Sequence, residues 1–182
     1  GIALIRGDVA GTMEHARRVI ELPREDDHFI HGAAFALLGL ASWTSGDLET
    51  AHGMFARGMA YLQKAGFIAD VIGGALTLSD IRITQGRLRE ALGNYERGLR
   101  LATQPGGPPL RGAADMLVGM SDIYREYNEL DAATQYLLRS QALGELNGLP
   151  KNPYRSRVAL AQIRAARGEL DSALDLLNKA ER

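Results

Sequence analysis

The segment Gly86-Arg-Leu-Arg-Glu-Ala91 decides the fold, because it recurs along the chain at a nearly constant interval. Copies that align without gaps are Gly46-Asp-Leu-Glu-Thr-Ala51, Asn128-Glu-Leu-Asp-Ala-Ala133 and Gly168-Glu-Leu-Asp-Ser-Ala173, and a degenerate copy starts at Gly7. The copies start at residues 7, 46, 86, 128 and 168, so the intervals are 39, 40, 42 and 40 residues. Regular intervals of this size indicate an array of structural repeats.

Each copy lies between two helical patterns. The residue four positions after the alanine is large and apolar, and spacings of three and four residues on both sides predict helices. Glycine or asparagine can adopt the left-handed backbone conformation that ends a helix, and an acidic residue next to it can cap the following one. The position seven residues before the turn is small, which lets two helix backbones approach closely; it holds Gly39, Ser79, Ser121 and Ala161.

The repeating unit is therefore a helix, a tight turn and a second helix, and the fold class is all-α. A single hairpin cannot bury its apolar face, so we expect the hairpins to stack into a solenoid. The 182 residues correspond to about 4.5 units of ~40 residues, in one repeat domain that spans residues 1–182. The pattern predicts helices at 8–22, 28–45, 48–64, 69–85, 88–103, 110–127, 130–146, 153–167 and 170–181, with Pro109 and Pro153 in first turns.

Composition excludes several functions. The chain has no cysteine, so thiol catalysis, zinc fingers and disulfide scaffolds are excluded. Its 21 basic and 22 acidic side chains give a net charge of −1, which argues against direct nucleic-acid contact. The longest apolar run, residues 32–41, is about half of the ~20 residues that a membrane helix needs. We expect a cytoplasmic location, and both ends resemble cuts through a longer multidomain protein.

The glycine at the turn, the small residue before it and the alanine after it resemble the tetratricopeptide repeat (TPR), a right-handed superhelical solenoid of antiparallel hairpins. The interval near 40 residues is longer than in that family and is similar to the sensor region of large ATP-dependent LuxR-type transcription regulators, typified by the activator of the maltose regulon. The most specific stretches run from Gly106 through Met116 and from Gly119 through Ala133, together with Ile81 through Leu99. The resemblance covers essentially the whole chain.

This resemblance implies the middle part of such a regulator: a non-enzymatic sensor that binds a small-molecule effector or a partner protein and relays the signal to separate ATPase and DNA-binding domains. The chain holds no phosphate-binding loop of the GxxxxGK[ST] type and no basic recognition helix. The alternative is a stand-alone TPR adaptor that binds a peptide or protein. No enzyme motif, cofactor fingerprint or membrane segment is found, and self-association stays possible for either reading.

In TPR-like superhelices the first helix of each hairpin lines the concave face. Projecting the positions six, three and two residues before each turn gives a polar set with one aromatic residue, which suits a sugar, a small metabolite or a peptide. The alternative is an ordinary solvated surface, with the indole ring packed against a neighbouring helix. The candidate binding residues are Trp43, Asp80, Thr84, Asp122, Arg125, Glu126 and Gln162.

Two further features leave alternatives open. Arg82 and Arg164 lie four residues before a turn, where the TPR pattern has tyrosine and where Tyr124 keeps it. Either these arginines extend out of a thinner interface, or the projection is shifted there by one helical position. His28 and His31, next to residues 25–27, have a spacing that could bind a metal, but two surface histidines in an acidic helix start explain them as well, and we predict no metal site.

Overall fold

The computed structural model describes residues 7–21, 27–104, 106–144 and 147–180, and these residues form helices joined by turns and loops, without a strand. The chain divides into two compact units, residues 1–91 and residues 92–182, which we describe separately. The predicted all-α fold of helix hairpins is confirmed. The prediction that residues 1–182 form a single domain stays a prediction.

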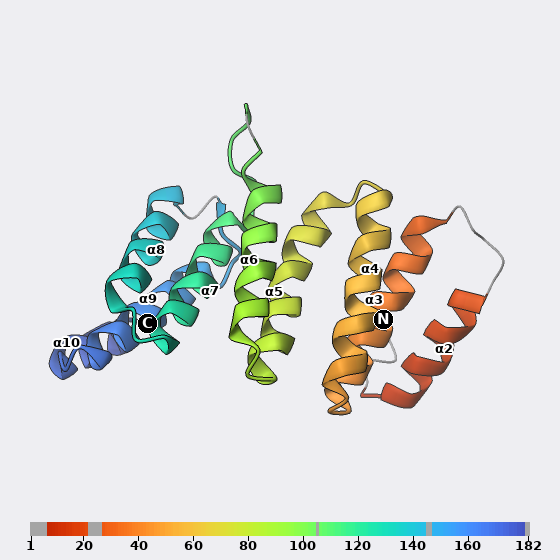
Figure 1. Ribbon diagram of the computed structural model, residues 1–182, viewed down its shortest axis with the longest axis horizontal. Coiled ribbons are helices and arrows are strands. Elements are labelled where there is room, and N and C mark those ends of the chain that lie inside the picture. Colours follow the sequence, from red (N-terminus) through yellow and green to blue (C-terminus); the bar gives the residue numbers. More distant parts are fainter. Residues whose placement is uncertain (1–6, 22–26, 105, 145–146, 181–182) are drawn as a thin grey trace. The chain divides into compact units, whose positions relative to one another are not determined.

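The first unit contains α2 (Val9–Glu21), α3 (His28–Thr44), α4 (Leu48–Lys64), α5 (Ile68–Thr84) and the start of α6 (Leu88–Ala102). Each of α2, α3 and α4 packs against the helix that follows it, as the red to yellow ribbons of Figure 1 show. The helices α3 and α5 are first helices of their hairpins, and α4 and α6 are second helices. A small core of Ala16, Ala34 and Leu38 holds α2 against α3.

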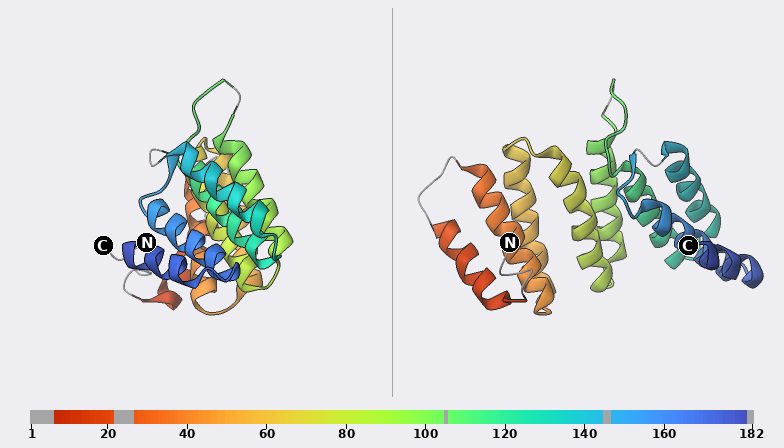
Figure 2. Two further views of the ribbon diagram at one scale, coloured as in Figure 1. Left: turned by 90° about the vertical axis from the view of Figure 1, so that its left-hand side faces the viewer. Right: turned by 180° about the vertical axis from the view of Figure 1, so that it is seen from behind.

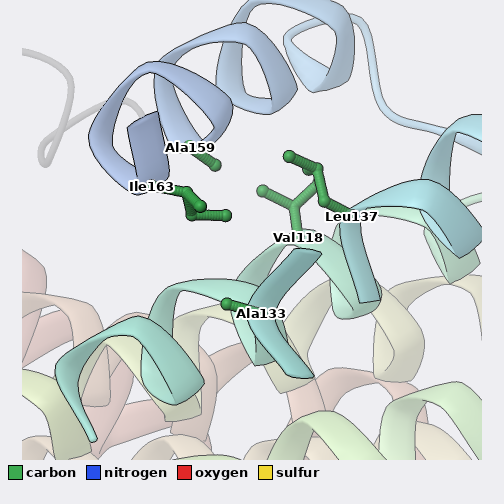
Figure 3. Close-up of a cluster of buried hydrophobic side chains, with 5 residues drawn as sticks. All are labelled: Val118, Ala133, Leu137, Ala159 and Ile163. Carbon is green, nitrogen blue, oxygen red and sulfur yellow. The ribbon is translucent and has the colours of Figure 1, made fainter. Parts of the chain in front are cut away.

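The second unit contains the rest of α6, then α7 (Ala113–Glu126), α8 (Leu130–Leu143), α9 (Asn152–Ala166) and α10 (Leu170–Ala180). The helix α9 packs against α8, α10 and also α7, so that two successive first helices touch (Figures 1 and 2). Their contact is a core in which side chains of α9 point toward α7 and α8 (Figure 3); it consists of Val118, Ala133, Leu137, Ala159 and Ile163.

The turns have the predicted conformation. The φ angle is 85° at Gly46, 73° at Gly86 and 81° at Gly168, and Asn128 takes the same role with a φ of 60°. The Cβ atom of most residues is strained in this left-handed region, whereas glycine adopts it freely and asparagine tolerates it. After the first of these turns the carboxylate of Asp47 accepts a hydrogen bond from the Thr50 N–H at 3.1 Å and caps α4.

The small residue seven positions before each turn sits against the second helix of its own hairpin. A Cβ atom added to Gly39 would lie 2.7 Å from the backbone N of Phe55, closer than any real contact. In the next two hairpins the hydroxyl groups of Ser79 and Ser121 fill the same place, and they donate to the carbonyl oxygens of Ala91 at 3.1 Å and Ala133 at 2.8 Å. A larger side chain would push the two helices apart.

Two predicted boundaries differ from the structure by three residues, whereas the other described boundaries differ by at most one. The helix α7 starts at residue 113 and not at 110, because Gly112 has a φ of 99° and the Leu110 N–H bonds to the Ala102 carbonyl. Pro109 therefore precedes the helix, whereas Pro153 does lie in a first turn. The helix α8 ends at Leu143, where Gly144 has a φ of 72°. Residues 22, 145–146 and 181 of the predicted helices lie outside the described residues.

Candidate binding surface

Three of the predicted binding residues belong to the first unit. Trp43 on α3 is half-buried, and Asp80 and Thr84 on α5 are exposed. The Thr84 hydroxyl donates to the backbone carbonyl of Asp80 at 2.8 Å, so this hydroxyl is used within its own helix. The carbonyl of Trp43 accepts the N–H of Gly46 at the turn. The half-buried indole fits both the packing role and the binding role that the sequence left open.

The other four residues belong to the second unit. Asp122, Arg125 and Glu126 lie on α7 and Gln162 lies on α9. Because α7 packs against α9, these side chains come from two first helices that are neighbours in space. Asp122 and Arg125 are half-buried, and Glu126 and Gln162 are exposed. The structure thus places the four residues on adjacent helices of one unit.

Arg125 is the most constrained of the four. Its Nη2 atom lies 2.8 Å from Glu126 Oε1, and its side chain is 24 % exposed. Its Nε atom is buried and has no hydrogen-bond partner. A buried donor that lacks a partner costs free energy. The binding role of Arg125 stays a prediction.

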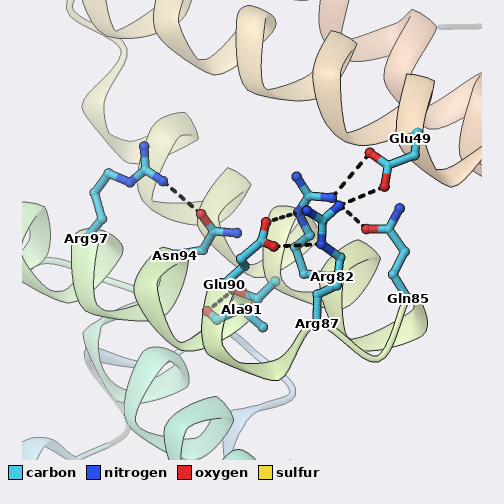
Figure 4. Close-up of polar contacts among 9 residues, drawn as sticks. Glu49, Arg82, Gln85, Arg87, Glu90, Ala91, Asn94 and Arg97 are labelled. Atoms are coloured by element: carbon cyan, nitrogen blue, oxygen red, sulfur yellow. Dashed lines mark hydrogen bonds and ion pairs between the residues drawn. The ribbon is translucent and has the colours of Figure 1, made fainter.

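The arginine that replaces tyrosine before the Gly86 turn does not extend into solvent. Arg82 is 8 % exposed, and its guanidinium lies 3.0 Å from Glu90 and 3.5 Å from Glu49, with a hydrogen bond of 2.7 Å to Gln85. Arg87 bonds to the same two carboxylates at 2.6 and 2.7 Å (Figure 4). Of the two explanations that the sequence left open, the first does not hold for Arg82, because the side chain is buried inside an ion network that joins α4, α5 and α6. The second, a shifted projection, stays a prediction.

The pKa of a histidine next to this network is lowered. His52 on α4 is partly buried, which disfavours its charged form, and the positive charge of Arg82 lowers the pKa further. Glu90 and Glu49 oppose this effect and Arg87 adds to it. The neutral imidazole is therefore the favoured form of His52 in the folded chain, and its protonation works against the fold.

The corresponding place in the second unit is aromatic. The ring of Tyr124 stacks on Tyr136 with centroids 4.9 Å apart, and it packs against the core around Val118. The pKa of the Tyr124 hydroxyl is raised, mainly by a hydrogen bond to Tyr136 and to a lesser degree by partial burial. At Arg164, in the next hairpin, the guanidinium forms an ion pair with Glu169 instead. One repeat position thus holds three different kinds of contact.

Sequence reasoning missed a buried carboxylate in the second unit. Asp115, in the first turn of α7, is 1 % exposed; it accepts the Leu149 N–H at 2.7 Å and lies 3.4 Å from Arg155. The guanidinium of Arg111 also bonds to the Gly148 carbonyl at 3.2 Å. These contacts tie the loop before α9 to the start of α7. The two partners of Asp115, Leu149 and Arg155, lie 34 and 40 residues away in the sequence. Only the repeat interval itself could have suggested that Asp115 pairs with them.

The two histidines at the start of α3 pack against an aromatic ring. Tyr61 of α4 has its ring centroid 5.9 Å from His28, 5.6 Å from His31 and 5.6 Å from Phe35. Residues 25 and 26, which were considered as further ligands, lie outside the described residues. Within the described part of the chain, no group of three or more His, Asp or Glu side chains is placed to hold a metal ion.

Helix hairpins of this kind, stacked through small residues and turned at a left-handed glycine or asparagine, define a TPR-like helical repeat protein. The chain belongs to the family of the MalT-like TPR region, whose model matches residues 1–182. The resemblance inferred from the sequence is confirmed at this level. None of the helices that the structure describes is both long and apolar enough to cross a membrane. No curated protein matches the sequence significantly.

Solved structures show the same fold. BtubC (BKLC) from P. vanneervenii has a TM-score of 0.73 and 18 % identity, with 97 % of this chain and 72 % of that chain covered. A kinesin-light-chain-type protein of Podosopora anserina with nearly identical TPR-like repeats has a TM-score of 0.71 and 16 % identity, covering 98 % and 88 %. MamA has a TM-score of 0.63 and 15 % identity, covering 98 % and 90 %. At these identities the likeness concerns the fold alone.

Proposed function

We propose that this chain is the sensor module of a LuxR-type transcription regulator, which binds an effector or partner protein and relays that event to separate ATPase and DNA-binding domains. The membership of the whole chain in the MalT-like TPR family carries this proposal. The TPR-like fold supports the coarser part, a protein-interaction and regulatory module without catalytic residues of its own. The mechanism is a shift between conformations of the repeat array that the bound ligand favours differently.

The binding surface in this proposal is the polar face of the first helices, and in the second unit it centres on Arg125. Asp122 and Glu126 supply acceptors and Arg125 supplies donors on α7, while the amide of Gln162 supplies both on the adjacent α9. Such a mixture recognises hydroxyl and amide groups, as in a sugar, a metabolite or a peptide backbone. In the first unit Trp43, Asp80 and Thr84 provide the corresponding surface on α3 and α5.

The first experiment reads the gene on both sides of the segment that encodes these residues. A phosphate-binding loop upstream and a helix-turn-helix segment downstream are expected. Stop codons close to both ends would contradict the regulator and would favour the alternative, a stand-alone TPR adaptor. This reading needs no knowledge of the ligand.

The second experiment tests the surface. The 182-residue chain is screened by thermal shift against a panel of sugars, nucleosides and amino acids, and a ligand that raises the melting temperature is tested again on Asp122→Ala/Arg125→Ala. We expect the shift to disappear in this double variant. The matched control is Arg139→Ala/Asp171→Ala, which changes one exposed arginine and one exposed aspartate on the second helices α8 and α10. An equal shift in both double variants would reject the surface.

A further inference from the structure

The last helix of the second unit, α10, exposes a strip of leucine side chains. Leu170 is 63 % exposed, Leu174 58 % and Leu177 41 %, and their spacing of four and three residues places them on one face of the helix. The helix packs against α9 of its own hairpin and lies at the end of the second unit (Figures 1 and 2). A contiguous apolar strip of this kind marks an interaction site.

The same repeat positions are covered in the other hairpins. The position of Leu177, nine residues after the turn residue, holds Phe55, Tyr95 and Leu137, of which 6 %, 1 % and 1 % are exposed. The counterparts of the other two leucines are half-buried, and they are Leu48, His52, Leu88, Leu92, Leu130 and Thr134. Because these positions otherwise lie between adjacent helices, a further helix is the shape that fits the leucine strip.

In the second unit the first helix of the following hairpin covers this strip with small and aliphatic residues. A Cβ atom at Gly119 would overlap the ring of Tyr95, so glycine allows α7 to lie directly on that ring. At the next junction Ala159 and, four residues later, Ile163 of α9 pack with Leu137 in one core (Figure 3). A helix that docks on α10 in the same way needs a small residue at the crossing and an aliphatic residue one turn later.

A carboxylate beside the strip adds a charge requirement. Three residues after the turn, Asp131 of α8 lies 2.7 Å from Arg167, which follows the small residue of α9 by eight positions. In the first unit Glu49 has this place and lies 2.7 Å from Arg87 of the following hairpin. Asp171 is the counterpart in α10; it is exposed, and no described residue forms an ion pair with it. A basic residue eight positions after the small one would complete the pattern.

From the leucine strip, the carboxylate of Asp171 and the two interfaces built on the same repeat positions, we propose that α10 is the docking surface for an amphipathic helix of a partner protein. This helix carries glycine or alanine at position i, an aliphatic residue at i+4 and arginine or lysine at i+8. A second copy of α10 is disfavoured, because it would bring the exposed carboxylates Asp171 and Asp175 of both copies together. The surface is separate from the first-helix surface, so the inference does not depend on the proposed function.

The probe is a synthetic peptide with the sequence of residues 152–167, which has the required pattern at Ala159, Ile163 and Arg167. It is titrated into the 182-residue chain, and heteronuclear NMR follows the backbone amides. We expect saturable shifts confined to α10 and the turn before it, with a Kd below about 1 mM, since a short peptide must fold into a helix as it binds. Absence of saturable shifts, or shifts at α8 in place of α10, would overturn the proposal.

Variants of the chain test the apolar strip. Leu170→Gln/Leu174→Gln changes the two most exposed leucines and should weaken peptide binding at least about tenfold, because their burial drives the association. The matched control is Leu138→Gln, which changes a leucine of α8 that is 51 % exposed and should leave binding unchanged. All three leucines are more than half exposed, so these variants should keep the fold, which circular dichroism checks. Equal affinities in the double variant and the control would reject the strip.

A charge exchange tests the predicted basic residue. Asp171→Arg should weaken binding of the peptide about threefold, in the range of an exposed ion pair. A peptide with Arg167→Glu should then bind the Asp171→Arg chain more tightly than it binds the wild-type chain. If the exchange brings no such recovery, the charge pattern of the proposed partner helix is wrong.

Two other occupants are separated by the same reagents. Sedimentation equilibrium of the chain alone should show no dimer that Leu170→Gln/Leu174→Gln dissociates; such a dimer would identify a second copy as the occupant. The peptide titration is then repeated on the whole polypeptide that the gene encodes, and binding should persist. Its loss would mean that another segment of the same polypeptide covers α10. Either result would overturn docking of a partner protein.

Discussion

The corners at Gly86 and Asn128 have the same backbone and different fillings. In both, a serine seven residues before the turn donates its hydroxyl to the alanine carbonyl of the second helix. Four residues before the turn, however, one corner holds Arg82 in a network of ion pairs and the other holds Tyr124 against a second tyrosine and an apolar core.

This difference separates two tasks of the repeat. The turn residue and the small residue before it fix the hairpin geometry, because a left-handed φ and a close helix contact accept few side chains. The position four residues before the turn only fills space between adjacent helices, so a polar network or an aromatic pair can serve there. The two fillings should differ in their contribution to stability and in their response to salt and pH.

The largest effect is expected at the aromatic corner. Tyr124→Ala removes a ring that packs on Tyr136 and on the core, and it should lower the free energy of unfolding by about 2 kcal/mol, less than for a fully buried ring because the side chain is half-buried. Urea unfolding followed by circular dichroism measures this change. Tyr124→Phe keeps the ring and should lose about 1 kcal/mol or less with the hydrogen bond to Tyr136.

The control for this prediction is Tyr154→Ala. Tyr154 is 54 % exposed, and its loss should stay within about 0.5 kcal/mol. If Tyr124→Ala were no more costly than Tyr154→Ala, the aromatic pair would not contribute to the second unit, and the two corners would be energetically equivalent.

A smaller effect, with a different signature, is expected at the polar corner. Arg82→Met keeps the apolar stem and removes the charge that faces Glu49 and Glu90, whose side chains are 70 % and 46 % exposed. Because solvent screens these carboxylates, the loss should be about 1 kcal/mol at low ionic strength. It should shrink in high salt, since salt screens the same interactions in the wild-type chain.

Urea unfolding at low and at high sodium chloride measures this dependence. The control Arg18→Met breaks an ion pair with Glu14 in which both side chains are more than half exposed, and it should be close to neutral at both salt concentrations. A loss for Arg82→Met that does not change with salt would mean that Arg82 acts through packing, as Tyr124 does.

The residues that impose backbone geometry were predictable from the sequence. The turn at Asn128 could be aligned with the glycine turns because asparagine, after glycine, is among the residues that best tolerate a left-handed φ. The helix ends were predictable to within a few residues, and the errors fell at Gly112 and Gly144, which lie outside the repeated motif. A glycine away from a repeat gives no signal of which conformation it adopts.

The contacts between repeats were not predictable. Arg82 meets Glu49 from the preceding hairpin and Glu90 from its own, and Asp115 meets Arg155 from the next. An aspartate in a first helical turn has an ordinary explanation in the helix dipole, so nothing in the sequence marks Asp115 as buried. The projected binding residues did fall on first helices, because the repeat pattern itself places them there.

The smallest effect is the pH dependence of the polar corner. In the folded chain the pKa of His52 is lowered, mainly by partial burial and also by the charge of Arg82. In the unfolded chain the imidazole titrates near 6.5. The unfolded chain therefore binds a proton that the folded chain resists, so the stability from neutral His52 is complete above the unfolded pKa. It is lost as the pH falls below about 6.5 toward the folded value.

Urea unfolding between about pH 7.5 and pH 5, the range where histidine titrates, should therefore show a smaller loss of stability for His52→Gln than for wild type. Arg82→Met should reduce the pH dependence as well, because it removes the positive charge that opposes protonation of His52. The exposed His15 provides the control, and His15→Gln should follow the wild-type profile. If His52→Gln retained the whole pH dependence, His52 would not report on the Arg82 network.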